Sequence, residues 1–120
     1  MKTEYTIFRV GDGAVERGEV DWPREPGYHK IRDLVEPILG DGEPMEHVSV
    51  LWQGKRADMF VSEYGHMALD SRPPLPRNDR ATDIYRTNWM NWMTQHPDED
   101  PESLPTIAGT AILFHRIVWT

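Results

Sequence analysis

The stretch TAILFHRIVW, Thr110 to Trp119, decides the fold that we predict for this chain. Its apolar side chains fall on both sides of an extended backbone, with Ile112, Phe114 and Val118 on one side and Leu113, Ile117 and Trp119 on the other. A strand that is apolar on both faces runs in the interior of a sheet. We therefore expect a strand over the whole stretch in the middle of a sheet, with the other elements arranged around it.

Two hairpins are predicted to supply the other strands. Glu4–Val10 is rich in β-branched and aromatic residues, and the glycines of Gly11–Gly13 provide a turn into a weaker strand over 14–22. His47–Trp52 and Ala57–Glu63 alternate around a tight QGKR turn, which is the pattern of a second hairpin.

Two amphipathic helices are predicted between these strands. The first has its apolar residues at helical spacing: Ile31, Leu34, Val35, Ile38 and Leu39. Pro37 removes a backbone donor and crowds the carbonyl four residues earlier, so we expect this helix to end or kink near Glu36. The second begins at Asp79 and keeps the 3.6-residue period through Trp89, Trp92 and Met93 before it stops at His96-Pro97.

The predicted element order is ββαββαβ. Helices packed on a mostly antiparallel sheet give an α+β fold of two layers. A chain of 120 residues is about the size of one ordinary domain, and no stretch of it is long enough to act as a linker between two. We therefore expect a single domain over residues 1–120.

The composition excludes several classes of protein. The chain has no cysteine, so disulfides, zinc ribbons and thiol nucleophiles are ruled out. Its net charge of −7 argues against direct binding of nucleic acid, which needs a surplus of Lys and Arg. The start MKTEYTIFRV lacks the apolar core of a signal peptide, and the longest apolar run, Ala111–Phe114, is too short to cross a bilayer. A cytoplasmic location without membrane contact is the expectation.

The passage PPLPRNDRATDIYR, Pro73 to Arg86, admits two interpretations. In the structural one, the prolines hold the chain extended and Asn78 or Asp79 caps the second helix with its side-chain oxygen. In the functional one, the free amides of the helix start bind a phosphate or carboxylate between Arg77 and Arg80. Asp79 and Asp83 would compete for these arginines, so the structural interpretation explains more of the spacing.

No catalytic or metal-binding pattern accompanies this passage. The five histidines form no HxH or HExxH spacing, no serine lies in a GxSxG elbow, and no phosphate-binding glycine loop is present. We predict no catalytic residue, metal or cofactor. Arg77, Asn78, Arg80, Tyr85 and Glu63 remain as candidate ligand-binding residues. Trp89 and Trp92 suit stacking of a base or sugar, although their helical stripe favours a role in the core or in a homo-oligomer contact.

Scattered pieces of the chain resemble a known family. FVSEYG, LPRNDRATDIY and PTIAGTAILF are similar to the "vnEeG", "LPxNxxA" and "I-x-G-T" passages of a family of small proteins of unknown function encoded by bacteriophages, plasmids and bacteria. The corresponding positions are Glu63, Gly65, Leu75, Pro76, Asn78, Ala81, Ile107, Gly109 and Thr110. The first hairpin and the segment Thr87–Pro105 depart from the pattern. The resemblance implies a mobile-element origin and an accessory role in conflict between phage and host, and it supplies no catalytic residue.

Three functions are consistent with these features. The first is a non-enzymatic binding module for a host protein or a small anionic ligand such as a nucleotide. The second is an acidic decoy that mimics DNA and blocks a nucleic-acid-binding protein. The third is a small enzyme acting on a phosphorylated metabolite, in which Arg77 and Arg80 hold the anion while Glu63 or His66 moves protons.

Overall fold

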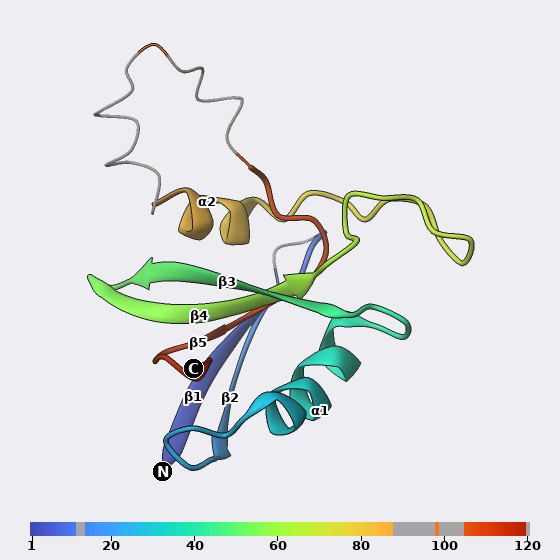
Figure 1. Ribbon diagram of the computed structural model, residues 1–120. Helices are drawn as coiled ribbons and strands as arrows, with labels where there is room; N and C mark the ends of the chain where they lie inside the picture. The colour runs from blue at the N-terminus through green and yellow to red at the C-terminus, as the bar shows by residue number, and fades with distance from the viewer. Residues whose placement is uncertain (12–13, 88–97, 99–104, 120) are drawn as a thin grey trace.

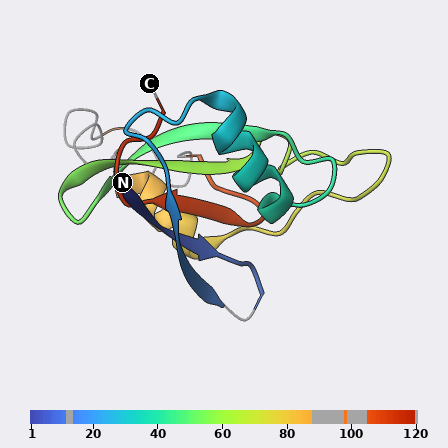
Figure 2. The ribbon, with the colours of Figure 1, turned by 90° about the horizontal axis from the view of Figure 1, so that it is seen from below.

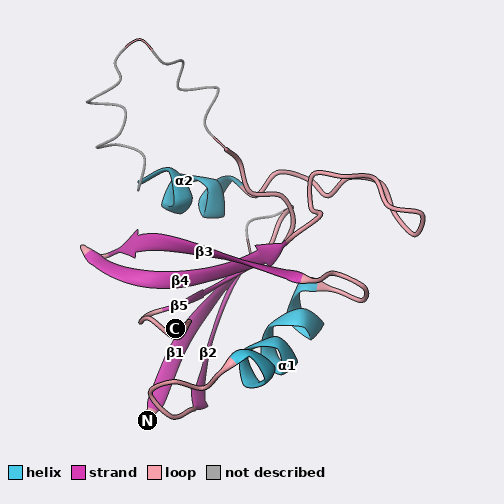
Figure 3. Ribbon diagram, in the orientation of Figure 1, coloured by secondary structure: helices cyan, strands magenta, loops and turns pink. Residues whose placement is uncertain are grey.

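The computed structural model describes residues 1–11, 14–87, 98 and 105–119. Five strands and two helices are arranged as Figures 1 and 3 show. Their bounds are β1 Lys2–Phe8, β2 Val15–Asp21, α1 Tyr28–Leu39, β3 Met45–Trp52, β4 Lys55–Ser62, α2 Asp79–Thr87 and β5 Ala111–Phe114. The α+β class and the order ββαββαβ are confirmed.

The five strands form one antiparallel sheet in the order β2-β1-β5-β4-β3. β5 therefore lies in the middle, between β1 and β4, as its two apolar faces predict. All four of its residues are buried. Ile112 and Phe114 belong to one hydrophobic cluster, and Ala111 and Leu113 belong to another on the opposite face.

The two helices cover opposite faces of the sheet (Figures 1 and 2). α1 packs on the face of Phe60 and Phe114 through Ile31, Val35 and Leu39. α2 packs on the other face, where Ala81 joins the cluster of Met59 and Leu113. The molecule therefore has three layers, helix, sheet and helix, and the expectation of two layers is wrong, because a central strand that is apolar on both sides needs a cover on each side.

Several boundaries differ from those expected. β5 ends at Phe114 instead of Trp119, because the buried carboxylate of Asp58 accepts hydrogen bonds from the backbone N–H groups of Val118 and Trp119, both at 2.8 Å, and turns the chain across the sheet. α1 does not end near Glu36 but continues through Pro37 to Leu39. Pro37 lies in the last turn on the exposed side, where the missing donor costs one hydrogen bond.

The turn of the second hairpin is shorter than the expected QGKR turn. Gln53 and Gly54 both have positive φ, 52° and 79°, which is the backbone of a two-residue turn that keeps β3 and β4 paired up to Trp52 and Lys55. β1 begins two residues before the predicted start. The extension of the second helix through Trp89 and Trp92 lies outside the described residues.

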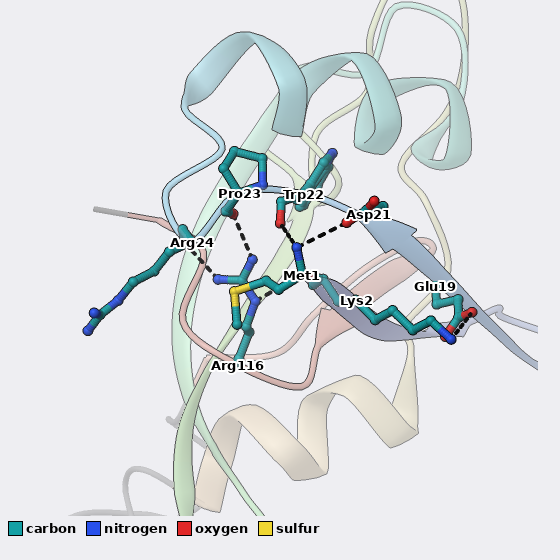
Figure 4. A network of polar contacts seen from close by, with 9 residues as sticks. Met1, Lys2, Glu19, Asp21, Trp22, Pro23, Arg24 and Arg116 are labelled. Carbon is teal, nitrogen blue, oxygen red and sulfur yellow. Dashed lines mark hydrogen bonds and ion pairs between the residues drawn. The ribbon is translucent and has the colours of Figure 1, made fainter.

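The chain ends are joined by a polar network (Figure 4). The Met1 amino group donates to the carbonyl of Trp22 at 2.8 Å and pairs with Asp21 at 3.0 Å. The Arg116 guanidinium donates to Thr3 Oγ1 and to the carbonyls of Pro23 and Arg24. The segment between β2 and α1 is therefore tied to both ends of the chain.

Within the described residues, no helix has the length and the apolar character that a crossing of the bilayer requires.

Replacement of Asp58 tests how the C-terminal segment is held. We expect Asp58→Ala to lower the free energy of unfolding by about 2–4 kcal/mol, because it strands two backbone N–H groups and removes the partner of His47. Asp58→Asn keeps an acceptor and should cost less. Urea denaturation measures both, with the exposed Asp70→Ala as control, and a loss for Asp58→Ala as small as that of the control would refute this role.

Candidate functional site

Three separated segments meet at the start of α2. Leu75 N–H donates to the Gly65 carbonyl at 2.8 Å, and Gly109 N–H donates to the Pro76 carbonyl at 2.8 Å. Asn78 N–H donates to the Ile107 carbonyl at 2.7 Å. Gly65, Leu75, Pro76, Asn78, Ile107 and Gly109 are thus gathered in one place, where they have structural roles.

Asn78 is the centre of this junction. Its side chain is buried, and its Nδ2 donates to the carbonyls of Phe8 at 2.8 Å and Gly109 at 2.9 Å. Its Oδ1 accepts from the N–H of Ala81 at 3.1 Å, which is the N-cap bond that the sequence predicts. One amide therefore joins β1, the segment before β5 and the start of α2, and it has no donor left for a ligand.

Two glycines allow the segments to approach this closely. A Cβ on Gly65 would lie 2.8 Å from the carbonyl oxygen of Ala108, closer than any ordinary contact. Gly109 has φ of 83°, a conformation that L side chains rarely adopt, and its Cα faces Leu75. The glycines at these two positions are explained by backbone packing and backbone conformation.

The arginines of the passage do not form an anion site together. Arg77 pairs with Asp79 at 3.1 Å, so the competition foreseen from the sequence occurs. Arg80 is exposed on the first turn of α2. The N–H groups of Ala81 and Thr82 are taken by the side-chain and backbone oxygens of Asn78. These two N–H groups are therefore not available to a phosphate.

Glu63 and Tyr85, by contrast, line one pocket. This pocket, of about 280 Å³, lies between α2, the β3–β4 hairpin and the segment that leads into β5. We call it the α2 pocket. Its lining residues are Glu46, Val48, Val61, Ser62, Glu63, His66, Tyr85, Pro105, Thr106, Ile107 and Ala108. Neither Arg77 nor Arg80 belongs to it.

The charge of the α2 pocket is negative. Glu46 pairs with Val61 across the hairpin, Glu63 comes directly after β4 ends at Ser62, and both residues line the pocket. Among the described residues, neither carboxylate forms an ion pair. Val48 and Val61 give the space between them an apolar floor.

The loop that carries Glu63 and His66 is held at both ends. His66 Nε2 donates to the Thr106 carbonyl at 2.7 Å. Arg72 donates to the carboxylate of buried Glu43 and to the carbonyls of Tyr64 and Met67. The hydrogen bond from Arg72 holds the pKa of Glu43 below its usual value near 4.5, with a smaller contribution from Ser62 and against the effect of burial.

Sequence analysis missed Glu46, Thr106 and the role of His66. Glu46 looks like an ordinary exposed position at the start of a strand, and only the register with Val61 places it beside Glu63. His66 and Thr106 are far apart in the sequence. Among the described residues, no three Asp, Glu or His side chains are grouped so as to hold a metal ion.

Two substitutions separate the junction role of Asn78 from simple helix capping. Asp and Asn are equally good N-caps, so a cap alone would tolerate Asn78→Asp. We expect instead that both Asn78→Ala and Asn78→Asp lower the free energy of unfolding by about 2–4 kcal/mol, because each leaves the Phe8 and Gly109 carbonyls without a donor. Wild-type stability of Asn78→Asp in thermal and urea unfolding would contradict the junction.

The lowered pKa of Glu43 predicts a dependence of stability on pH. Since the folded state binds the Glu43 proton less tightly than the unfolded state does, its contribution is present above about pH 4.5 and is lost as pH falls through the folded pKa. Glu43→Gln should lower the free energy of unfolding at pH 7. Between pH 5 and 3, the free energy of unfolding should fall less for this variant than for the wild-type protein. If the free energy of unfolding, measured by urea titration, falls equally for the two proteins between pH 5 and 3, this role is excluded.

Comparison with known proteins identifies no relative: no family model, no curated protein and no solved structure matches the chain. The function is therefore inferred from the arrangement of its own residues.

Proposed function

We propose that the protein is a non-enzymatic binding module whose α2 pocket receives a basic side chain of a partner protein in the host cytoplasm. The observation that carries this proposal is that Glu46 and Glu63 line one pocket with an apolar floor and that, among the described residues, neither carboxylate forms an ion pair.

The energetics of the pocket support a cationic ligand. Two carboxylates that line one small pocket repel each other, and this repulsion destabilises the isolated protein. A guanidinium or ammonium group removes that repulsion and gains hydrogen bonds to both carboxylates. The methylene groups of an Arg or Lys side chain suit the floor of Val48 and Val61, and Tyr85 offers an aromatic ring in the same wall.

The other hypotheses find less support at this site. An enzyme acting on a phosphorylated metabolite needs the arginines and the proton-transfer groups in one cavity, whereas Glu63 and His66 line the α2 pocket and Arg77 and Arg80 do not. An anionic nucleotide would meet two carboxylates there. The acidic-decoy hypothesis rests on net charge. It predicts that binding of a nucleic-acid-binding protein depends on many carboxylates instead of on Glu46 and Glu63 alone.

A titration with model compounds tests the pocket directly. The probes are N-acetyl-arginine methylamide and N-acetyl-lysine methylamide, with the uncharged norleucine analogue as control, followed by NMR shifts of Val48, Val61 and Tyr85. We expect the charged probes to bind and the norleucine probe not to bind. The double variant Glu46→Gln/Glu63→Gln should weaken binding about tenfold or more, since it removes two charge-assisted hydrogen bonds.

Matched variants distinguish the pocket from general acidity. Glu25→Gln and Asp70→Asn remove exposed carboxylates elsewhere and should leave the affinity unchanged. Equal weakening by the matched pair would support the decoy instead, and absence of binding by either charged probe would overturn the proposal. Cross-linking of the wild-type protein and of the same variants in bacterial lysate shows whether binding of a captured protein depends on the pocket.

A further inference from the structure

The strand β2 forms an open edge of the sheet. The strand order places β1 on one side of it and, among the described residues, no strand on the other (Figure 1). Five of its seven residues are exposed, and the other two are only partly buried. An open edge offers backbone N–H and C=O groups to a further strand, and many proteins block such an edge with a bulge or a proline. β2 has neither, because its sequence is VERGEVD and its register with β1 is continuous from Val15 to Asp21.

The register shows which residues direct their backbone groups to the open side. Trp22 N–H donates to the Met1 carbonyl at 3.0 Å, and Arg9 N–H donates to the Ala14 carbonyl at 3.1 Å. These two bonds lie at the two ends of the hairpin, and hydrogen-bonded pairs alternate with non-hydrogen-bonded pairs between them. The even-numbered residues of β2 therefore direct their N–H and C=O groups to β1. Four residues direct theirs to the open side: Val15, Arg17, Glu19 and Asp21.

The charges of β2 are complementary to those of a second copy of the same strand. Arg17 precedes the central residue, Gly18, and Glu19 follows it, so an antiparallel copy centred on Gly18 has Arg17 opposite Glu19 at two positions. This register also pairs residues whose backbone groups point outward, as hydrogen bonding between the strands requires. A shift by two residues in either direction keeps the hydrogen bonds but sets Arg17 opposite Arg17 or Glu19 opposite Glu19, which is destabilising.

Both charged side chains are available for this pairing. Arg17 is exposed and, within the part of the chain that the structure describes, forms no ion pair. Glu19 lies 4.0 Å from the Nζ atom of Lys2, in a pair whose side chains are 53% and 81% exposed (Figure 4). A surface pair of this kind contributes little stability. The Glu19 carboxylate can therefore also accept hydrogen bonds from a guanidinium of a second copy.

Gly18 leaves the centre of the strand free of a side chain. A Cβ at this position would overlap the ring of Tyr5, its partner residue in β1. The Tyr5 ring also packs on Phe114, with ring centroids 5.8 Å apart, so it belongs to the core on the α1 side. Two copies of β2 can thus meet at Gly18 in a non-hydrogen-bonded pair, where the Cα atoms approach to about 4.5 Å.

The other edge of the sheet, β3, lacks these features. Its first N–H, that of Met45, donates to the Glu36 carboxylate at 3.1 Å, so part of that edge already has a partner. Its sequence, MEHVSVLW, contains one carboxylate and no Lys or Arg. β3 therefore has no pattern of opposite charges with which a second copy could pair.

We propose that β2 pairs with β2 of a second copy, antiparallel and centred on Gly18, so that two five-stranded sheets join into one. The Arg17 and Glu19 side chains specify another copy of this chain as the partner and fix the register. Because the contact is one strand wide, its area is small and the association is weak. The proposal does not depend on the α2 pocket, which borders β3 at the other edge of the sheet.

Charge reversal tests this pairing. Arg17→Glu sets carboxylates opposite each other at two positions, and Glu19→Arg does the same with guanidinium groups. Each variant alone should self-associate at least about tenfold more weakly than the wild-type protein. An equimolar mixture of the two variants should associate again, because each strand then meets opposite charges. Sedimentation equilibrium from micromolar to millimolar concentration measures these affinities, and circular dichroism checks that each variant is folded.

The matched controls are Lys55→Glu and Asp70→Arg, which change the net charge by the same amounts at exposed positions outside β2. They should leave self-association unchanged. A wild-type protein that stays monomeric at millimolar concentration would overturn the proposal. So would reversals at Arg17 and Glu19 that act no more strongly than the controls, or a mixture of the two variants that does not associate.

Hydrogen exchange followed by NMR tests the register. The N–H groups of Gly18 and Val20 bind β1, so they should be protected at every protein concentration. The N–H groups of Arg17 and Glu19 should gain protection only at concentrations at which the protein associates. Association without added protection at Arg17 and Glu19 would show that the copies meet through another surface.

Discussion

The fold depends on one buried amide, the side chain of Asn78. It donates to two carbonyls and accepts from one N–H, and these groups belong to β1, to the segment before β5 and to α2. A buried carbonyl without a hydrogen-bond donor has lost its hydrogen bonds to water without replacement, so each of these bonds stabilises the fold. Because Asn78 fixes α2 against the sheet, it also fixes Tyr85 in the wall of the α2 pocket. The pocket therefore exists only as long as this junction holds.

The central position of β5 explains why the molecule has two separate surfaces. Ile112 and Phe114 require a cover on one face, and Ala111 and Leu113 require another on the opposite face. α1 and the C-terminal segment supply the first, and α2 supplies the second. Each cover leaves its own border, and the border of α2 contains the α2 pocket.

Much of this arrangement could be predicted from the sequence, because it follows from local rules. The two apolar faces of β5 place it inside the sheet, and Asn78 before an amphipathic run predicts a cap. The sites could not be predicted, because they arise from register and from contacts between distant segments. Glu46 becomes a neighbour of Glu63 only through its pairing with Val61. Asp58 lies in β4, far from β5 in the sequence, and its hydrogen bonds to the segment after β5 end that strand at Phe114. The same hydrogen bonds hold Trp119 where it contacts Tyr28.

The net charge of −7 hides an uneven distribution. Asp58 and Glu43 are buried and bound to backbone N–H groups or to Arg72, so they contribute to the fold and little to the outer surface. The exposed carboxylates Glu46 and Glu63 line a pocket on one side of the sheet. An acidic decoy would need its carboxylates spread over one continuous face, as phosphates are on DNA. Two carboxylates gathered at one pocket instead favour a single small cationic group, recognised on the side of the sheet that carries α2.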